Sequence, residues 1–113
     1  MAYSGVDTSA PVDASNGQVN ASSTSMTAPS VTTTGANRML VALFGTPVLT
    51  SSTPPGGMTE RFDQQVPSTN QYKVTTETAD QTVAATGATG NRVATALNAA
   101  ANIGQLVALK PAP

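Results

Sequence analysis

The sequence predicts an all-β fold of about six to eight short antiparallel strands, arranged as a sandwich or a barrel. Three observations support it. Short stretches of β-branched and apolar residues alternate with polar residues, as in strands buried on one face. Turn-forming residues recur about every 8 to 12 residues, the spacing typical of sandwiches and barrels. The longest apolar run, residues 39–44, has the length of a strand rather than of a helix.

The N-terminal part of the chain is polar and is expected to be mostly irregular. Residues 3–6 are predicted to form a short strand. Residues 7–23 are predicted to be a loop or an extended arm, because Asp, Asn, Gly and Ser favour turns over strand pairing. Residues 24–34 are rich in β-branched side chains but contain Pro29, which donates no hydrogen bond to a neighbouring strand. We therefore expect an edge strand there at best.

The middle of the chain holds the strongest strand signal. Residues 38–45 contain six consecutive apolar side chains between turn-forming residues, which predicts a strand buried on both faces. Residues 46–57 are expected to be a loop, because two prolines are followed by two glycines. Residues 58–63 alternate and predict a half-buried strand with Met58 and Phe62 pointing inward.

Residues 71–79 show the clearest alternation in the chain. Its two faces are Tyr72, Val74, Thr76 and Thr78 on one side and Lys73, Thr75 and Glu77 on the other. Residues 81–85 are expected to form another strand, and residues 86–90 are a glycine-containing turn.

The C-terminal part is more ambiguous. Residues 92–97 suit a helical turn or a strand, and the Thr- and Val-rich context favours the strand. Residues 98–102 are expected to be a loop, and residues 103–110 a second buried strand that Pro111 ends. These expectations divide the chain into a short strand and polar arm at 1–23 and one β-sandwich domain at 24–113.

The composition excludes several classes of function. The chain has no His, Cys or Trp, so disulfides, thiol nucleophiles, zinc–thiolate sites and imidazole bases are ruled out. Five basic residues are too few for a phosphate-tracking surface, so no nucleic-acid partner is expected. The sequence has neither a membrane-length apolar run nor a signal-peptide pattern at its start, so no membrane partner is expected.

The acidic residues do not suggest a catalytic or metal site. Glu60 and Asp63 are three positions apart, as are Glu77 and Asp80, and residues three apart on a strand point to opposite faces. Asp7 and Asp13 lack the dense acidic spacing of a calcium loop. We therefore expect no enzyme, no catalytic residue, no metal, no cofactor and no small-molecule substrate.

Five stretches in order carry a family resemblance: AYSGVD at 2–7, ANRMLVALF at 36–44, TPPGGMTER at 53–61, TGATG at 86–90 and VALKP at 107–111. Together they resemble a jelly-roll-like β-sandwich module found in phage structural proteins and large bacterial surface proteins. In that module further strands come before the first stretch, so the chain resembles its C-terminal half. The resemblance implies an antiparallel jelly-roll-like β-sandwich with an extended polar N-terminal arm.

The function expected from this resemblance and from the low charge is structural. The leading hypothesis is a bacteriophage virion protein, a capsid decoration (cement) protein that is made in the host cytoplasm and stabilises contacts between capsid subunits. The alternative is a carbohydrate- or surface-binding module of a phage tail fibre or a secreted bacterial protein. Its recognition loops would be residues 46–57 and 66–70, with Tyr72 as a contact.

Both an incomplete sheet and an unprotected Thr-rich edge predict assembly. The expected partners are further copies of the chain, most simply a trimer around a capsid axis, and a major capsid or other virion protein. The alternative is that the arm folds back and completes the chain's own sheet. The residues expected to make assembly contacts are Asp7, Pro11, Val12, Asp13, Val19, Met26, Pro29 and Val31.

Overall fold

The computed structural model describes residues 1–66 and 72–113, which form an antiparallel all-β protein. The strands are, in chain order, β1 (Val12–Ala28), β2 (Thr32–Thr33), β3 (Arg38–Thr46), β4 (Ser52–Thr53), β5 (Thr59–Val66), β6 (Val74–Val83), β7 (Gly87–Ala88) and β8 (Arg92–Leu109). The described residues contain no helix, and so none that could cross a membrane. The predicted all-β antiparallel fold is confirmed, and the arrangement is compatible with a β-sandwich.

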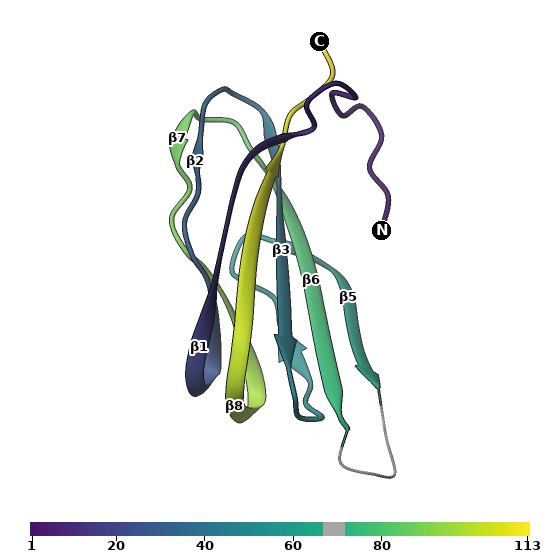
Figure 1. Ribbon diagram of the computed structural model, residues 1–113, viewed down its shortest axis with the longest axis vertical. Helices are drawn as coiled ribbons and strands as arrows, with labels where there is room; N and C mark the ends of the chain where they lie inside the picture. Colours follow the sequence, from purple (N-terminus) through teal and green to yellow (C-terminus); the bar gives the residue numbers. More distant parts are fainter. Residues whose placement is uncertain (67–71) are drawn as a thin grey trace.

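One sheet has the strand order β1-β8-β3-β6-β5 (Figure 1). The apolar strand β3 lies at its centre, where Val41 pairs with Val107 of β8 on one side and Asp80 of β6 on the other. This central position explains why the run at 39–44 is nearly continuous in apolar residues. At the two edges, β1 and β5 have no further partner strand among the described residues.

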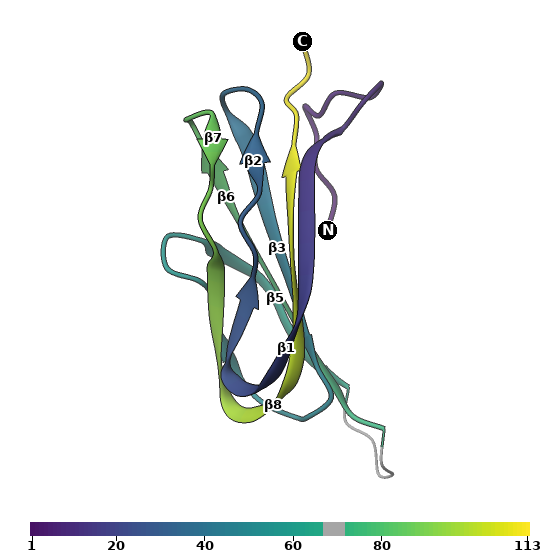
Figure 2. The same cartoon turned by 60° about the vertical axis from the view of Figure 1, so that its left-hand side comes forward.

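A second layer forms because β1 and β8 are long enough to leave this sheet and fold over it (Figure 2). Residues 12–20 of β1 pair with residues 102–109 of β8 in the first layer, which we call the main layer. Residues 25–28 of β1 pair with residues 92–95 of β8 in the second layer. There β4 also pairs with β8, and the short strands β2 and β7 pair with each other.

The core lies between the two layers and is rich in alanine. Leu40, Phe44 and Leu106 project into it from the main layer, and Met26 projects from the second. Buried alanines fill the space between them: Ala28, Ala42, Ala79, Ala94, Ala96 and Ala108. Such small side chains allow the two layers to approach closely.

The bend in β1 and β8 is held by two asparagines. Asn20 donates from its side-chain amide to the Asn102 Oδ1 at 2.7 Å and to the Thr27 carbonyl at 3.0 Å. Asn102 is 3% exposed and donates in turn to the Ser25 carbonyl. Gly104 faces the same crossing, where a Cβ would lie only 2.2 Å from the Thr27 carbonyl oxygen. The pairing register shifts between Asn20 and Ser25, so the strands turn the corner at bulges.

The expectation of an extended N-terminal arm is wrong for residues 12–23. They belong to β1 and pair with β8, so this segment folds back and completes the chain's own sheet, as in the alternative weighed from the sequence. The polar composition indicated a loop, but it is equally compatible with this strand. β1 lies at the edge of the sheet, and the residues of its first half are mostly exposed. At residues 3–6 only Val6 is paired, in a single bridge to Pro111.

Two boundaries also differ from expectation. Residues 92–97 are a strand, as predicted, but residues 98–102 continue it rather than forming a loop. Residues 81–83 extend β6 and are not a separate strand. In both places polar or small residues continue a strand because they pair with a neighbouring strand. Residues 81–83 pair with β3, and residues 100 and 102 pair with β1 at the bend.

The expected inward face of residues 58–63 is confirmed only in part. Met58 is buried as expected, but Phe62 is 44% exposed on the outer side of β5. On β6 the face that carries Thr75 and Glu77 points into the core, and Thr78 and Asp80 on the other face are buried as well. The core run on β3 is confirmed at Phe44, although Leu43 remains partly exposed.

Asp13 fastens the start of β1 to the loop between β2 and β3. Its Oδ2 accepts hydrogen bonds from the Arg38 Nε at 2.9 Å and the Thr34 backbone N–H at 2.8 Å, and its Oδ1 accepts one from the Thr34 hydroxyl. The hydrogen bonds from Thr34 and the ion pair with Arg38 lower the pKa of the Asp13 carboxyl to about 2. The Asp13 side chain is 1% exposed, so the group is part of the folded structure rather than a free contact.

Candidate functional site

The outer surface of the main layer carries an apolar patch. Residues paired directly across neighbouring strands project from the same face, so the register identifies its members. Ile103 pairs with both Val19 and Gly45, while Leu43 and Phe62 both pair with Thr78. We define the outer patch as the large apolar side chains exposed on this face: Val19, Leu43, Phe62, Val66, Val74 and Ile103.

The outer patch is strongly exposed and uncharged. Val19 is 81% exposed and Val66 60% exposed. The residues between them in the register are small or neutral: Gly17, Gly45, Gln64, Thr76, Thr78 and Gln105. Val19, Val74 and Ile103 also line a shallow apolar hollow beside the β3 end at Pro47. Soluble monomers rarely expose a contiguous apolar surface of this kind without a partner for it.

The N-terminal segment, residues 1–7, covers the other end of this face. The Tyr3 hydroxyl donates to the Asp80 Oδ2 at 2.9 Å, and the Arg61 Nε donates to the same carboxylate at 2.9 Å. Burial and the hydrogen bond to Asp80 raise the pKa of Tyr3 to about 12. Residues 5–7 pair with residues 110–112, which anchors the segment to the C-terminal end of β8. The charged groups of this face are therefore engaged beside the segment, and the outer patch beyond it is left neutral.

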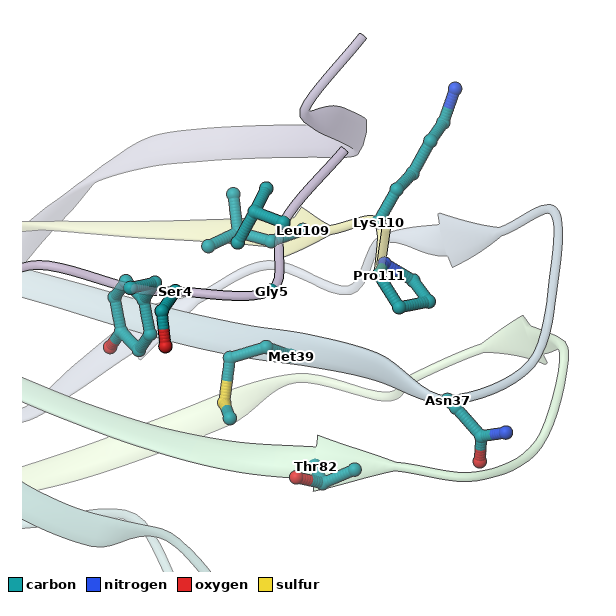
Figure 3. Close-up of a pocket in the computed structure, with 10 residues that line it drawn as sticks. Ser4, Gly5, Asn37, Met39, Thr82, Leu109, Lys110 and Pro111 are labelled. Carbon is teal, nitrogen blue, oxygen red and sulfur yellow. The ribbon is translucent and has the colours of Figure 1, made fainter. Parts of the chain in front are cut away.

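A small hollow lies under this segment (Figure 3). Gly5, Met39, Thr82 and Leu109 line it, and the Lys110 side chain extends away from it. Its volume of about 170 Å³ is below the roughly 300–1,000 Å³ typical of sites for small organic ligands. The hollow is best explained as imperfect packing of an irregular segment against the ends of three strands.

A cluster of three carboxylates lies on the inner face of β5 and β6. Glu60, Asp63 and Glu77 each place an oxygen within 4.8 Å of those of the other two. Asp63 pairs directly with Glu77, and a register shift between Glu60 and Phe62 turns Glu60 to the same side. The prediction that Glu60 and Asp63 point to opposite faces is therefore wrong, because a β-bulge breaks the two-residue period. Asp80 does lie on the opposite face from Glu77, as predicted.

The three carboxylates of this cluster repel one another when all are ionised, and the innermost of them is buried. Glu77 is 1% exposed, and the pKa of its carboxyl is raised to about 7 by burial and then by the charges of Glu60 and Asp63. The Ser52 hydroxyl faces it and opposes the rise, but forms no hydrogen bond of acceptable geometry within the described residues. The Ser52 backbone N–H donates to the Asp63 Oδ2 at 3.1 Å, which brings β4 to the cluster.

The residues expected to make assembly contacts fall into two groups, some buried or bonded within the chain and some exposed. Met26 and Val31 are core residues, so the expectation that they contact another chain is wrong for the folded chain. Asp7 accepts hydrogen bonds from Ser9 and Ala10 in an exposed turn. Asp13 binds Arg38, and Pro29 is half-buried, whereas three residues remain exposed: Pro11, Val12 and Val19. Only Val19 belongs to the outer patch, and none of the other patch members was among the expected assembly contacts.

Comparison with protein-family models, curated proteins and solved structures finds no match to the chain. The functional assignment therefore depends on the two features described above, the outer patch and the carboxylate cluster.

Proposed function

We propose that the chain is a structural protein of a bacteriophage virion, most concretely a jelly-roll-like decoration protein that docks on the capsid through the outer patch. The observation that supports this best is the exposure of six large apolar side chains on one sheet face, with only uncharged residues between them in the register. Burying such a face requires a broad protein surface rather than a small molecule. The low charge of the chain as a whole fits a role inside a stable assembly.

The chemistry of the patch defines its partner. Because the exposed side chains and their neighbours in the register are neutral, the complementary capsid surface is apolar and contains no unpaired charge. The edge strand β1 adds a second contact. It is 17 residues long, has one side without a partner strand in the described residues, and carries no lysine to block pairing. Further copies of the chain can pair at this edge around a capsid axis.

The carbohydrate-binding alternative has weaker support. Of the four aromatic residues, Phe44 is in the core and Tyr3 is bonded to Asp80. The remaining two, Phe62 and Tyr72, are exposed. The loop proposed for recognition at 66–70 lies outside the described residues except for Val66.

Co-sedimentation with undecorated capsids of the phage that encodes the chain tests the proposal. We expect saturable binding by the full chain. We expect Ile103→Asp to weaken binding by about 100-fold, because it places a charge in a desolvated apolar contact. Leu97→Asp is the matched control: the same strand carries this exposed apolar residue in the second layer, away from the patch. It should bind like the unmodified chain.

Three outcomes contradict the proposal. The first is a monodisperse monomer without affinity for any capsid. The second is equal weakening by both substitutions, which would show that the outer patch has no special part. The third is a saturable hit on a glycan array that is lost in Tyr72→Ala, which would establish the carbohydrate-binding alternative instead.

A further inference from the structure

Glu77 is a buried carboxylate that has no hydrogen-bond partner among residues 1–66 and 72–113. Its side chain is 1% exposed, and neither of its oxygens accepts a hydrogen bond within the part of the chain that the structure describes. Two further buried oxygens beside it also lack a partner there, the Asp63 Oδ1 and the Ser52 Oγ. Buried polar atoms are almost always paired, so four unpaired oxygens at one place indicate a missing positive partner.

The geometry of the cluster suits a cation of calcium size. One oxygen from each of Glu60, Asp63 and Glu77 lies within 4.8 Å of the others. Oxygen ligands bind Ca²⁺ at about 2.3–2.6 Å, so ligands of one ion are separated by at most about 5 Å. No described basic side chain forms an ion pair with the cluster: the ion pairs of residues 1–66 and 72–113 are Arg38–Asp13 and Arg61–Asp80, both outside it.

The three carboxylates also differ in burial in a way that suits binding from solvent. Glu60 is exposed, Asp63 is half-buried and Glu77 is fully buried, so the cluster leads from the surface at the edge strand β5 into the sandwich. Ser52 approaches from the other layer, where β4 pairs with β8. A cation in this position would contact both layers.

We propose that Glu60, Asp63 and Glu77, together with the Ser52 hydroxyl, bind one divalent cation of the hard, oxygen-preferring class, with Ca²⁺ as the favoured ion. Ca²⁺ accepts irregular sets of carboxylate and hydroxyl oxygens, whereas Mg²⁺ requires near-octahedral geometry and retains more water. Zinc is disfavoured because the chain has neither His nor Cys. The bound ion clamps β4 of the second layer to β5 and β6 of the main layer. This role is independent of capsid docking.

Calorimetric titration and thermal unfolding of the full chain, first stripped with EDTA, test the proposal with CaCl₂ and MgCl₂ as probes. We expect one Ca²⁺ per chain, with a dissociation constant of about 0.1–1 mM, the range of weak extracellular sites. We expect 10 mM Ca²⁺ to raise the unfolding temperature by roughly 5 °C or more, with a smaller rise for Mg²⁺. Absence of saturable heat together with an unchanged unfolding temperature overturns the proposal.

Paired variants locate the effect. Glu77→Gln keeps the shape of the side chain and should lower Ca²⁺ affinity at least about 10-fold, as should Asp63→Asn if the first variant does not fold. Asp7→Asn makes the same change in net charge at an exposed turn outside the cluster and should keep the full Ca²⁺ response. Equal Ca²⁺ responses in the cluster variant and in Asp7→Asn overturn the proposal, because the ion would then act only on the overall charge.

Discussion

Gly104→Ala should destabilise the protein by about 3 kcal/mol or more, or prevent folding. The added Cβ would lie 2.2 Å from the Thr27 carbonyl oxygen and 2.7 Å from the Ala28 backbone nitrogen. Both contacts are with backbone that is itself held in the second layer, so no side-chain movement relieves them. The layers would have to separate at the bend of β1 and β8. Urea unfolding followed by circular dichroism measures the loss.

Gly56→Ala provides the control for this substitution. A Cβ at Gly56 meets no atom within 4 Å, and its backbone is not in the left-handed region. We expect a change in the free energy of unfolding within about 0.5 kcal/mol. If Gly104→Ala is as stable as Gly56→Ala, the backbone of Thr27 does not pack against Gly104 at the bend of β1 and β8, which would contradict this account of how the layers join.

Asp13→Ala should cost about 2 kcal/mol at neutral pH. The substitution leaves Arg38, whose side chain is 13% exposed, without its carboxylate and removes the acceptor for two hydrogen bonds from Thr34. Breaking a fully buried pair costs about 3–5 kcal/mol, and the surface position of Thr34 reduces this. Asp13→Asn, which retains an acceptor for Thr34, should lose less. Chemical unfolding of both variants gives the ranking.

The contribution of Asp13 should also depend on pH. Its pKa is about 2 in the folded chain and near 3.8 when unfolded, so the folded chain keeps the carboxylate ionised where the unfolded chain takes up a proton. The stabilisation is therefore fully present above about pH 4 and is lost as the pH falls toward 2. The difference in stability between the unmodified chain and Asp13→Asn should shrink over that interval. A difference that stays constant down to pH 2 would contradict the ion pair with Arg38.

Strand positions could be predicted where the local pattern and the tertiary environment agree. The run at 39–44 is apolar because β3 lies at the centre of the main layer, so the sequence indicates both the strand and its burial. The first half of β1, residues 12–20, has no comparable apolar run or alternation that would indicate a strand. Its residues are mostly exposed, and its strand conformation depends on pairing with β8, which lies about 80 to 100 residues later in the chain.

The two candidate sites could not be predicted for different reasons. The outer patch is assembled from residues that alternate normally along five strands, and only the register shows that they share a face. The carboxylate cluster depends on the bulge between Glu60 and Phe62, which has no proline or glycine to mark it. Without that bulge the two-residue period places Glu60 and Asp63 on opposite faces. Asp63 and Glu77 are close because they pair directly, and Glu60 joins them only because of this local irregularity.

Electron cryo-microscopy of capsids that carry this chain tests the docking role of the outer patch most directly. We expect the main layer to face the capsid, with Val19, Leu43 and Ile103 buried against an uncharged apolar surface of the capsid protein and the second layer facing solvent. A reconstruction in which these three side chains face solvent, or in which the chain is attached through the second layer, would contradict the proposed function.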